Sequence, residues 1–355
     1  MQQITIVGLG LIGGSIGLGL RAWSENAGKA EGATLQVTGF DIDLEQQHYA
    51  QKIKAVDRTE WDLTNAIRNA DVVVICTPVK AIQETFTNIA PHLKAGTVVT
   101  DTGSTKSEVI KWAQELLPTT VSFVGTHPMA GKAVSIEGAD ASLFAGATWC
   151  VCPDARASED AIRNVLGMIA ALDAEPYFID PAEHDAYVAG ISHLPFVLAA
   201  SLVNAVSSDP SWRDMRTLTA SGFRDMSRLA AGSPDMHRDI AITNKDAILR
   251  WLDRYEAQLE EFRVRLSSND ETALEQLGAF FDHARDARAD WATQTSREGE
   301  LLHGTESELS RESFGGQMGR MLLGGFGRRR ADLTDRTGQK TAHPDRNGTA
   351  NSDRT

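Results

Sequence analysis

The sequence predicts an α/β domain followed by an all-helical domain. Short apolar, β-branched runs alternate with helix-like segments up to about residue 180, and the strand signals then stop. Longer segments with apolar residues at helical spacing come after Pro181. Alternating strands and helices are typical of a parallel sheet that is covered by helices on both faces. With 355 residues, the chain is long enough for two ordinary domains.

We expect the first domain to span residues 1–180 and the second to span residues 181–293. Strand-like runs of the first domain lie at 3–8, 35–40, 71–76, 96–101, 121–125, 148–152 and 175–180. Its helix-like segments include 79–93, 105–117 and 158–174. Helical periodicity in the second domain covers 182–208, 244–268 and 271–293. These long helices carry more apolar surface than one small bundle readily hides, which predicts a homodimer, with a compact monomeric bundle as the alternative.

The composition changes again in residues 294–355. The last part, 331–355, contains no aromatic residue and is mostly polar, so we predict a disordered tail. The net charge of −13 for the whole chain argues against a nucleic-acid or anionic-membrane partner. It does not oppose an anionic small-molecule substrate, because a few well-placed arginines outweigh a diffuse acidic surface.

The N-terminus and the cysteines indicate a cytoplasmic protein. The opening MQQITIVGLG lacks the basic and apolar regions of a signal peptide. We expect no apolar segment long enough to span a bilayer. Cys76, Cys150 and Cys152 have no evident further ligands nearby, which predicts small buried side chains and no metal site. That pattern suits a reducing compartment.

A glycine-rich loop follows the first strand-like run and precedes a helix. In GLGLIGG, the glycines Gly8, Gly10 and Gly13 form G-x-G-x-x-G, with Leu9 and Ile12 between them. The first glycine allows a tight turn, the second lets the backbone approach a pyrophosphate, and the third lets the helix pack closely on the strand. Because of its position, the motif predicts a Rossmann-type dinucleotide-binding domain.

The next two strands offer further contacts to a dinucleotide. Asp41 ends the second strand, where a carboxylate accepts hydrogen bonds from ribose hydroxyls and repels a 2′-phosphate, so NAD is favoured over NADP. It comes 28 residues after Gly13, more than the usual ~20, and a loop insertion at 25–34 accounts for the excess. A solvent-exposed role for Asp41, with Asp43 as the binding carboxylate, is the alternative. Thr77, after the strand at 71–76, is expected at the cofactor cleft.

Two polar segments should meet at the carboxyl edge of the sheet, where such folds bind ligands. DTGSTK brings Ser104 and Lys106 to that edge, and GTHPMAG brings His127. Pro128 stiffens the backbone at His127 by restricting the residue before it. Alternatively, Ser104 could merely cap the following helix, near Glu108. The dinucleotide loop close by favours a role in catalysis.

The helical domain adds a histidine and several arginines. GISHLPF contains His193 on an apolar stretch, where a lone histidine is more often a satisfied core group than a catalyst. The segment 222–240 contains Arg224, Arg228 and Arg238. In the same segment, Arg224–Asp225 and Arg238–Asp239 could be simple surface ion pairs.

The motifs, taken in order, resemble the prephenate/arogenate dehydrogenase family of tyrosine biosynthesis. The resemblance rests on GLGLIGGSIGLGL, DTGSTK, GTHPMAG, SLFAG, ISHLPF and GFRDMSRLAAGSPDMHRDI, and runs from Gly8 to roughly Trp291. It implies NAD-dependent oxidative decarboxylation of prephenate to 4-hydroxyphenylpyruvate, or of arogenate to tyrosine. The preference for prephenate comes only from its frequency in the family.

The resemblance also assigns roles to residues. His127 is implied as the base that takes the proton of the substrate hydroxyl, and Ser104 as the group that orients this hydroxyl. Arg228 and His193 match substrate-binding positions of the family. One departure is Ala133, which stands where many relatives have an acidic residue. That residue's role in orienting the substrate is therefore in doubt.

Two other functions remain possible at this point. A β-hydroxyacid dehydrogenase would use a lysine base on the helical domain, for which Lys245 is the candidate, but GTHPMAG and ISHLPF argue against it. A regulatory protein that senses NAD without turnover would need the glycine loop but no catalytic histidine. Replacing His127 should then change nothing that the protein does.

Overall fold

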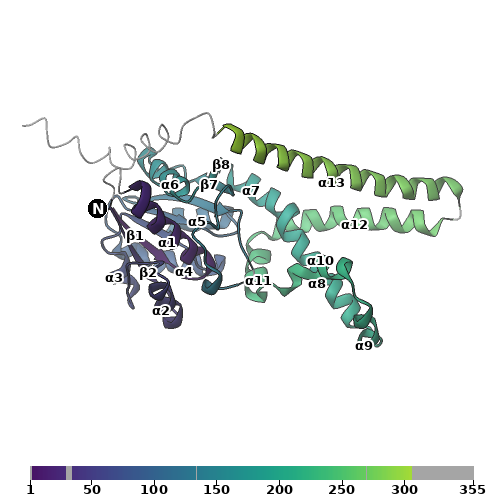
Figure 1. The fold of residues 1–355 in the computed structure, drawn as a ribbon, viewed down its shortest axis with the longest axis horizontal. Helices are drawn as coiled ribbons and strands as arrows, with labels where there is room; N and C mark the ends of the chain where they lie inside the picture. The colour runs from purple at the N-terminus through teal and green to yellow at the C-terminus, as the bar shows by residue number, and fades with distance from the viewer. Residues whose placement is uncertain (1, 29–33, 133, 269, 306–355) are drawn as a thin grey trace, which may run out of the picture.

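The structure is a computed structural model that describes residues 2–28, 34–132, 134–268 and 270–305. An eight-stranded sheet with helices on both faces occupies the first half of the chain, and the described residues after it form helices and their connections but no strand (Figure 1). The predicted α/β domain followed by an all-helical domain is therefore confirmed.

The strands form one sheet in the order β3-β2-β1-β4-β5-β6-β7-β8. The central strand β4 is apolar along its whole length because helices cover both faces of the sheet, and all four of its residues, VVVI, are buried. After β3 the chain returns across the sheet to β4, which pairs with β1 on the side away from β2. The strand order therefore reverses between β1 and β4, which is the point where ligands bind in sheets of this kind. The strand bounds are β1 (Gln2–Val7), β2 (Leu35–Phe40), β3 (Arg58–Thr59), β4 (Val72–Ile75), β5 (Val98–Asp101), β6 (Ser122–Pro128), β7 (Thr148–Pro153) and β8 (Glu175–Phe178).

The sheet differs from the predicted parallel one at a single pairing, because β7 runs antiparallel to β6. A parallel connection needs a crossover, usually a helix. Between β6 and β7 the described residues contain only the short 3-10 helix η3 (Ile136–Gly138), so the chain turns straight back. The helix α6 (Glu159–Ala171) carries the chain from β7 to β8, and these two strands are parallel.

Two apolar cores lie on opposite faces of the sheet. One contains side chains of α1 (Leu11–Trp23), α2 (Leu44–Lys52) and α6. The other contains those of α3 (Leu63–Ile67), α4 (Val79–Ile89) and α5 (Ser107–Leu116). In α4 the buried apolar residues recur every three or four positions, as Val79, Ile82, Phe86 and Ile89 do. The helix η2 (Ala90–His92) extends α4, and η1 (Ser24–Gly28) extends α1.

The regular elements in the described part of the second half of the chain are all helices. Its longest helices, α12 and α13, run side by side as a hairpin (Figure 1), and Phe262 of α12 packs against Phe280 and Phe281 of α13. The bounds are α7 (Pro181–Val188), η4 (Ala189–His193), α8 (Leu194–Ser207), α9 (Trp212–Met215), η5 (Arg216–Leu218), α10 (Ser221–Ser227), η6 (Arg228–Ala231), α11 (Pro234–Thr243), α12 (Lys245–Ser267) and α13 (Glu271–Thr305).

Helix α13 continues past residue 293, where we expected the tail to begin, and ends at Thr305. Residues 306–355, the remainder of the predicted tail, lie outside the described part of the chain.

One stretch is long and apolar enough to cross a membrane by length and composition, against our expectation that none would be. It is Pro181–Ser207, which joins α7, the π-helix η4 and α8. The same stretch holds buried polar side chains at His184, Asp185 and His193. In this fold it therefore serves as the element that brings polar groups of the helical half to the sheet.

Candidate active site

The glycine loop, Gly8–Gly13, is shaped by close backbone contacts. Gly8 has φ +95°, and a Cβ there would lie 2.7 Å from the main chain of Cys76. A Cβ on Gly13 would lie 2.0 Å from the carbonyl oxygen of Gly8. A Cβ on Gly10 would meet nothing within 4 Å. The loop is thus tight where it packs on the sheet and open at Gly10, where a dinucleotide needs room.

The side chains between the glycines point into the protein. Leu9 is fully buried, and Ile12 packs against the core that contains α1. Helix α1 begins after Gly10, which has no side chain to cap its amides. An anion can therefore bind these amides at the positive end of the helix.

Asp41 lies against the glycine loop. Its Oδ2 accepts a hydrogen bond of 2.6 Å from the amide of Leu9, and its Oδ1 accepts one of 2.9 Å from the amide of Asp43. The carboxylate of Asp43 caps helix α2 by accepting from the amide of Glu45. Of the two candidates for the ribose carboxylate, Asp41 is therefore the one at the loop.

Thr77 follows β4 beside the same loop. Its hydroxyl is buried and has no hydrogen-bond partner among the described residues. A buried hydroxyl without a partner is costly, which makes it a candidate contact for a ligand. Together with the room at Gly10 and the carboxylate of Asp41, it fits a dinucleotide cofactor.

We had expected His127 just beyond the end of its strand. In the structure it lies within β6. The strand continues to Pro128 because β7 pairs with it, and His127 faces Cys150 across the pair. Its imidazole is partly exposed, and Nδ1 lies 3.0 Å from Nε2 of His184 on α7. The two rings meet edge to face, with centroids 5.2 Å apart. The histidine of the sheet is thus held by a histidine of the helical half.

Asp185 anchors this contact. Its carboxylate accepts a hydrogen bond of 2.9 Å from Nδ1 of His184, and two of 2.8 and 2.9 Å from the amides of Lys106 and Ser107. The amides belong to the start of α5, so Asp185 caps that helix from another part of the chain. Burial opposes ionisation, yet these hydrogen bonds lower the pKa of the Asp185 carboxyl.

Ser104 is therefore not the cap of α5. Helix α5 begins at Ser107. Its N-cap residue is Lys106, whose side chain makes no hydrogen bond to the helix. The hydroxyl of Ser104 is partly exposed and makes no hydrogen bond within the described part of the chain. It lies three residues after β5, on the edge of the sheet that carries His127.

Lys106 does not emerge at the edge of the sheet, contrary to our prediction. Its Nζ forms an ion pair with Oδ2 of Asp101, and both side chains are 0% exposed. Asp101 also accepts hydrogen bonds from the amides of Gly103 and Thr126. A buried charge is stable only when it is paired and hydrogen-bonded, which explains why the lysine turns inward.

His193 ends the π-helix η4 and is almost fully buried. Its Nδ1 lies 3.1 Å from the amide nitrogen of Asn244, which also donates to the main-chain oxygen of Asp185 at 2.7 Å. Nε2 of His193 is buried without a partner among the described residues. We call His127, His184, His193, Asp185 and Asn244 the histidine cluster.

Two rings of the histidine cluster are held neutral. Burial, and then the electrostatic influence of His184, Lys106 and His193, lower the pKa of His127 well below 6.5. Burial lowers the pKa of His193 to about 4, although Asp185 acts in the opposite direction. A neutral imidazole can accept a proton near neutral pH, which suits a general base.

The arginines of the segment 222–240 make no hydrogen bond or ion pair with the histidine cluster among the described residues. Arg228 is exposed at the start of η6 and makes no hydrogen bond or ion pair with any described residue. Arg238 pairs with Asp235 and Asp239, as a surface ion pair would. Within this one chain, Arg228 is therefore not in contact with the cluster. Ala133 lies outside the described residues.

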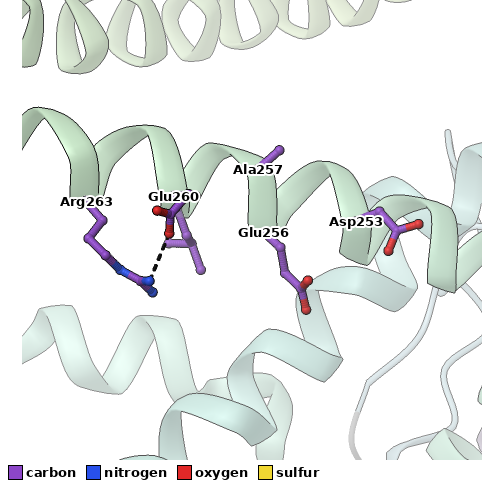
Figure 2. Close-up of a pocket in the computed structure, with 6 residues that line it drawn as sticks. Asp253, Glu256, Ala257, Glu260 and Arg263 are labelled. Carbon is purple, nitrogen blue, oxygen red and sulfur yellow. Dashed lines mark ion pairs between the residues drawn. The ribbon is translucent and has the colours of Figure 1, made fainter.

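A hollow on the surface of α12 contains none of the predicted site residues. Figure 2 shows that its lining comes from this helix alone, with Arg263 paired to Glu260 at 2.8 Å. A cofactor site draws on several elements that converge. The glycine loop and the histidine cluster meet that condition, and this hollow does not.

The sequence reading missed the residues that hold the two histidines in place. His184, Asp185 and Asn244 lie in segments that we read only as helical. The adjacent pair His184–Asp185, preceded by the helix-starting Asp180–Pro181, was a usable signal. Burial of both side chains, which gives the pair its meaning, is visible only in the fold.

Comparison with known proteins identifies the family. The model of the prephenate dehydrogenase nucleotide-binding domain matches residues 26–177, and that of the prephenate dehydrogenase dimerization domain matches residues 180–279. Prephenate dehydrogenase of Bacillus subtilis (strain 168) is 33% identical over 290 residues, which cover 81% of this chain and 75% of the relative. Cyclohexadienyl dehydrogenase of Zymomonas mobilis is 32% identical over 274 residues, which cover 76% and 90%.

Solved structures agree. Prephenate dehydrogenase from A. aeolicus, in complex with hydroxyphenyl propionate and NAD+, has a TM-score of 0.73 and 25% identity, and the match covers 82% of this chain and 98% of that one. Synechocystis arogenate dehydrogenase has a TM-score of 0.67 and 28% identity, with 82% and 100% covered. The expected resemblance is confirmed: the chain belongs to the prephenate dehydrogenase family.

Proposed function

We propose that this chain catalyses the NAD-dependent oxidative decarboxylation of prephenate to 4-hydroxyphenylpyruvate, a step of tyrosine biosynthesis. The observation that carries the proposal is the neutral His127, held by His184 at 3.0 Å on the edge of the sheet that also bears the glycine loop. Relatives named prephenate dehydrogenase support this choice of substrate.

His127 acts as the general base. When bound, NAD accepts the hydride from the carbinol carbon of the substrate. His127 takes the proton from the hydroxyl on that carbon, and its low pKa keeps it ready to do so at neutral pH. Ser104, whose hydroxyl has no other partner among the described residues, orients the same hydroxyl. Loss of the ring carboxylate as carbon dioxide then makes the ring aromatic.

The substrate is a dicarboxylate, so it needs donors and positive charge. His193 contributes a buried Nε2 that no described residue uses. Arg228 contributes a guanidinium, which binds a carboxylate in two parallel hydrogen bonds better than lysine does. Because Arg228 is exposed and away from the cluster, it reaches substrate through closure of the helical region or from a second copy of the chain.

The backbone of the glycine loop, at Gly8, Leu9, Gly10, Ile12 and Gly13, would hold NAD, and Asp41 and Thr77 would offer it further contacts. The carboxylate of Asp41 accepts from the amide of Leu9 with one oxygen and from Asp43 with the other. A 2′-phosphate at this place would meet a negative charge that the loop holds fixed. NAD is therefore preferred over NADP.

The enzyme works as a homodimer in the cytoplasm, with residues 1–180 as the cofactor domain and 181–293 as the substrate and dimerisation domain. The helical hairpin exposes large apolar side chains, which a second copy would cover: Leu249, Leu259, Val264, Leu266 and Phe281. The family model that matches residues 180–279 describes a dimerization domain. The described cysteines are free thiols, as in a reducing compartment.

Arogenate is the second candidate substrate, since a Synechocystis arogenate dehydrogenase has a similar fold and a cyclohexadienyl dehydrogenase a similar sequence. It differs from prephenate by an amino group in place of a keto group. No described residue distinguishes the two. A β-hydroxyacid dehydrogenase is disfavoured, because its candidate base, Lys245, is exposed at the start of α12.

The test is a direct assay of the purified protein with prephenate or arogenate, each with NAD or NADP, followed by the absorbance of reduced nicotinamide. We expect turnover with prephenate and NAD, and a decrease in kcat of about 10²- to 10⁴-fold in His127→Asn. The control is His48→Asn, an exposed histidine of α2 that should leave kcat unchanged.

Each other outcome has a distinct meaning. Turnover that survives in His127→Asn would remove this residue as the base. Turnover only with arogenate would replace the substrate but keep the chemistry. Tight NAD binding with no turnover for any pair would favour a protein that senses NAD.

A further inference from the structure

We infer that Asp185 fixes opposite proton positions on the two site histidines: Nδ1–H on His127, through His184, and Nε2–H on His193, through Asn244. Asp185 and its neighbours are positioning residues in this scheme. The assignment of protons follows from hydrogen-bond geometry and from the burial of His184. Only its catalytic consequence rests on the proposed function.

The first branch starts at the carboxylate of Asp185. A carboxylate accepts hydrogen bonds, so the bond of 2.9 Å to His184 places a proton on Nδ1 of that ring. The amides of Lys106 and Ser107 and the N-terminus of α5 already offset the negative charge. His184 is 1% exposed, and burying a charged imidazolium would be costly. His184 is therefore neutral, with a bare Nε2.

The bare Nε2 of His184 decides the state of His127. It lies 3.0 Å from Nδ1 of His127, and a hydrogen bond between two ring nitrogens needs one proton. Because His184 has none to give at this atom, Nδ1 of His127 must carry it. The lone pair of neutral His127 is then on Nε2, which has no hydrogen-bond partner among the described residues. That atom is the one free to take a proton from substrate.

The second branch starts at the main-chain oxygen of Asp185. The amide nitrogen of Asn244 lies 2.7 Å from this oxygen, and a carbonyl accepts only, so the amide must point its NH₂ group there. The same nitrogen lies 3.1 Å from Nδ1 of His193. It donates its second N–H to that ring, so Nδ1 of His193 is the bare atom and the proton is on Nε2. This buried Nε2–H has no partner in the described part of the chain.

The two histidines thus offer complementary groups. His127 presents a lone pair, as a base requires, and His193 presents an N–H, which binds a substrate oxygen. Both states depend on one residue of α7 that also caps α5 of the other domain. Docking of the helical region on the sheet therefore sets the protonation pattern, and a misdocked chain would lose both.

The direct test is a two-bond ¹H–¹⁵N correlation spectrum of the full-length protein labelled with ¹⁵N-histidine, recorded at about pH 7.5, where a neutral imidazole is expected. The nitrogen shifts of a neutral ring distinguish the protonated from the bare nitrogen. Spectra of His127→Asn and His193→Asn assign the two rings. We expect Nδ1–H for His127 and Nε2–H for His193. The opposite pattern on either ring, or a doubly protonated His184, would overturn the inference.

Two variants separate the branches. His184→Phe removes the acceptor of His127 but keeps a ring of similar size, and should leave His127 with mixed tautomers while His193 is unchanged. Asn244→Leu should do the reverse. The unaffected histidine reports in each case that the site is folded. If a variant fails to fold, the wild-type spectrum alone still decides.

Activity gives the second readout. In His184→Phe we expect kcat to fall by about tenfold or more with little change in KM. The ring of His127 would no longer be held with its bare nitrogen toward the substrate, while the substrate contacts remain. An unchanged kcat, with mixed tautomers in the spectrum, would show that the proton position does not matter for turnover. If the wild type has no dehydrogenase activity, the spectrum still tests the proton assignment, so failure of the proposed function and failure of the inference remain distinct.

Discussion

The glycine loop and the histidine cluster, which we propose serve the same reaction, are built in opposite ways. The loop is formed by six consecutive residues, Gly8–Gly13, and its shape comes from backbone contacts such as the approach of Gly8 to Cys76. The cluster joins groups that lie 57 and 51 residues apart along the chain, His127 to His184 and His193 to Asn244. Steric contacts of a few neighbouring residues set the conformation of the loop. Hydrogen bonds between the two halves of the molecule hold the cluster together.

This difference predicts different weaknesses. A tight backbone turn fails when a side chain is added, and it does so without regard to pH. A buried polar network fails when a charge is left without its partner or when a neutral ring is protonated. Changes that affect one region and spare the other can therefore test the comparison.

The largest effect on stability is expected beneath the histidine cluster. Lys106→Met leaves the fully buried carboxylate of Asp101 without its ion-pair partner. We expect the free energy of unfolding to fall by about 3–5 kcal/mol. Denaturant unfolding measures it. The matched control is Lys94→Met, which breaks the exposed pair with Asp71 and should cost about 1 kcal/mol or less. Equal losses in the two variants would contradict the view that this ion pair is structurally important.

The next effect is the dependence of stability on pH. The pKa of His193 is about 4 in the folded protein and 6.5 as an unperturbed group. Below pH 6.5 the unfolded chain binds this proton more readily than the folded protein does. The contribution of neutral His193 to the free energy of unfolding is therefore fully present above pH 6.5, and it is lost as the pH falls toward 4. The difference corresponds to roughly 3 kcal/mol. Between pH 7 and pH 4, His193→Asn should lose less stability than the wild type by about this amount. Parallel pH profiles for the two proteins would refute it.

The glycine loop gives a pair of smaller effects that differ in kind. Gly13→Ala brings a Cβ onto the carbonyl of Gly8, so it should lower stability by about 1–3 kcal/mol. Gly10→Ala adds a Cβ where no atom lies within 4 Å, so the free energy of unfolding should not change.

The Cβ of Gly10→Ala would, however, occupy space needed by the pyrophosphate, and we expect the Kd for NAD to rise by about tenfold or more. Thermal unfolding and calorimetric titration with NAD test the pair, and a Gly10→Ala variant that binds NAD normally would count against this loop as the cofactor site.

The smallest effect is expected in the pH dependence of catalysis. The pKa of His127 lies well below 6.5, and a base works in its deprotonated form. The value of kcat/KM should therefore stay level from about pH 8 down to about pH 6.5 and decline only at lower pH. A decline centred at or above pH 6.5 would mean that the burial of His127 is relieved in the working enzyme.

Much of the site could be anticipated from local patterns, and the rest could not, for a physical reason. The motif of Gly8, Gly10 and Gly13 can be recognised because its requirements lie within a few residues. The turn leaves no room for a Cβ at Gly8 or Gly13, and Gly10 keeps open the space that a dinucleotide needs. Lys106 was misplaced because the pattern DTGSTK does not reveal that its charge would be neutralised by Asp101 inside the sheet. His184 and Asp185 were missed because their value comes from burial.

The sequence by itself determined the order of the two domains, the glycine loop with Asp41 after the next strand, and the presence of His127 beside a stiff Pro128. These follow from periodicity and steric demands that act over short stretches of chain. Only the tertiary structure decided that β7 returns antiparallel and extends β6 through His127. It alone also decided that Asp185 caps α5 while holding His184. Hydrogen bonds between distant segments exist only once the chain has folded and excluded water from them, so no local pattern can specify their partners.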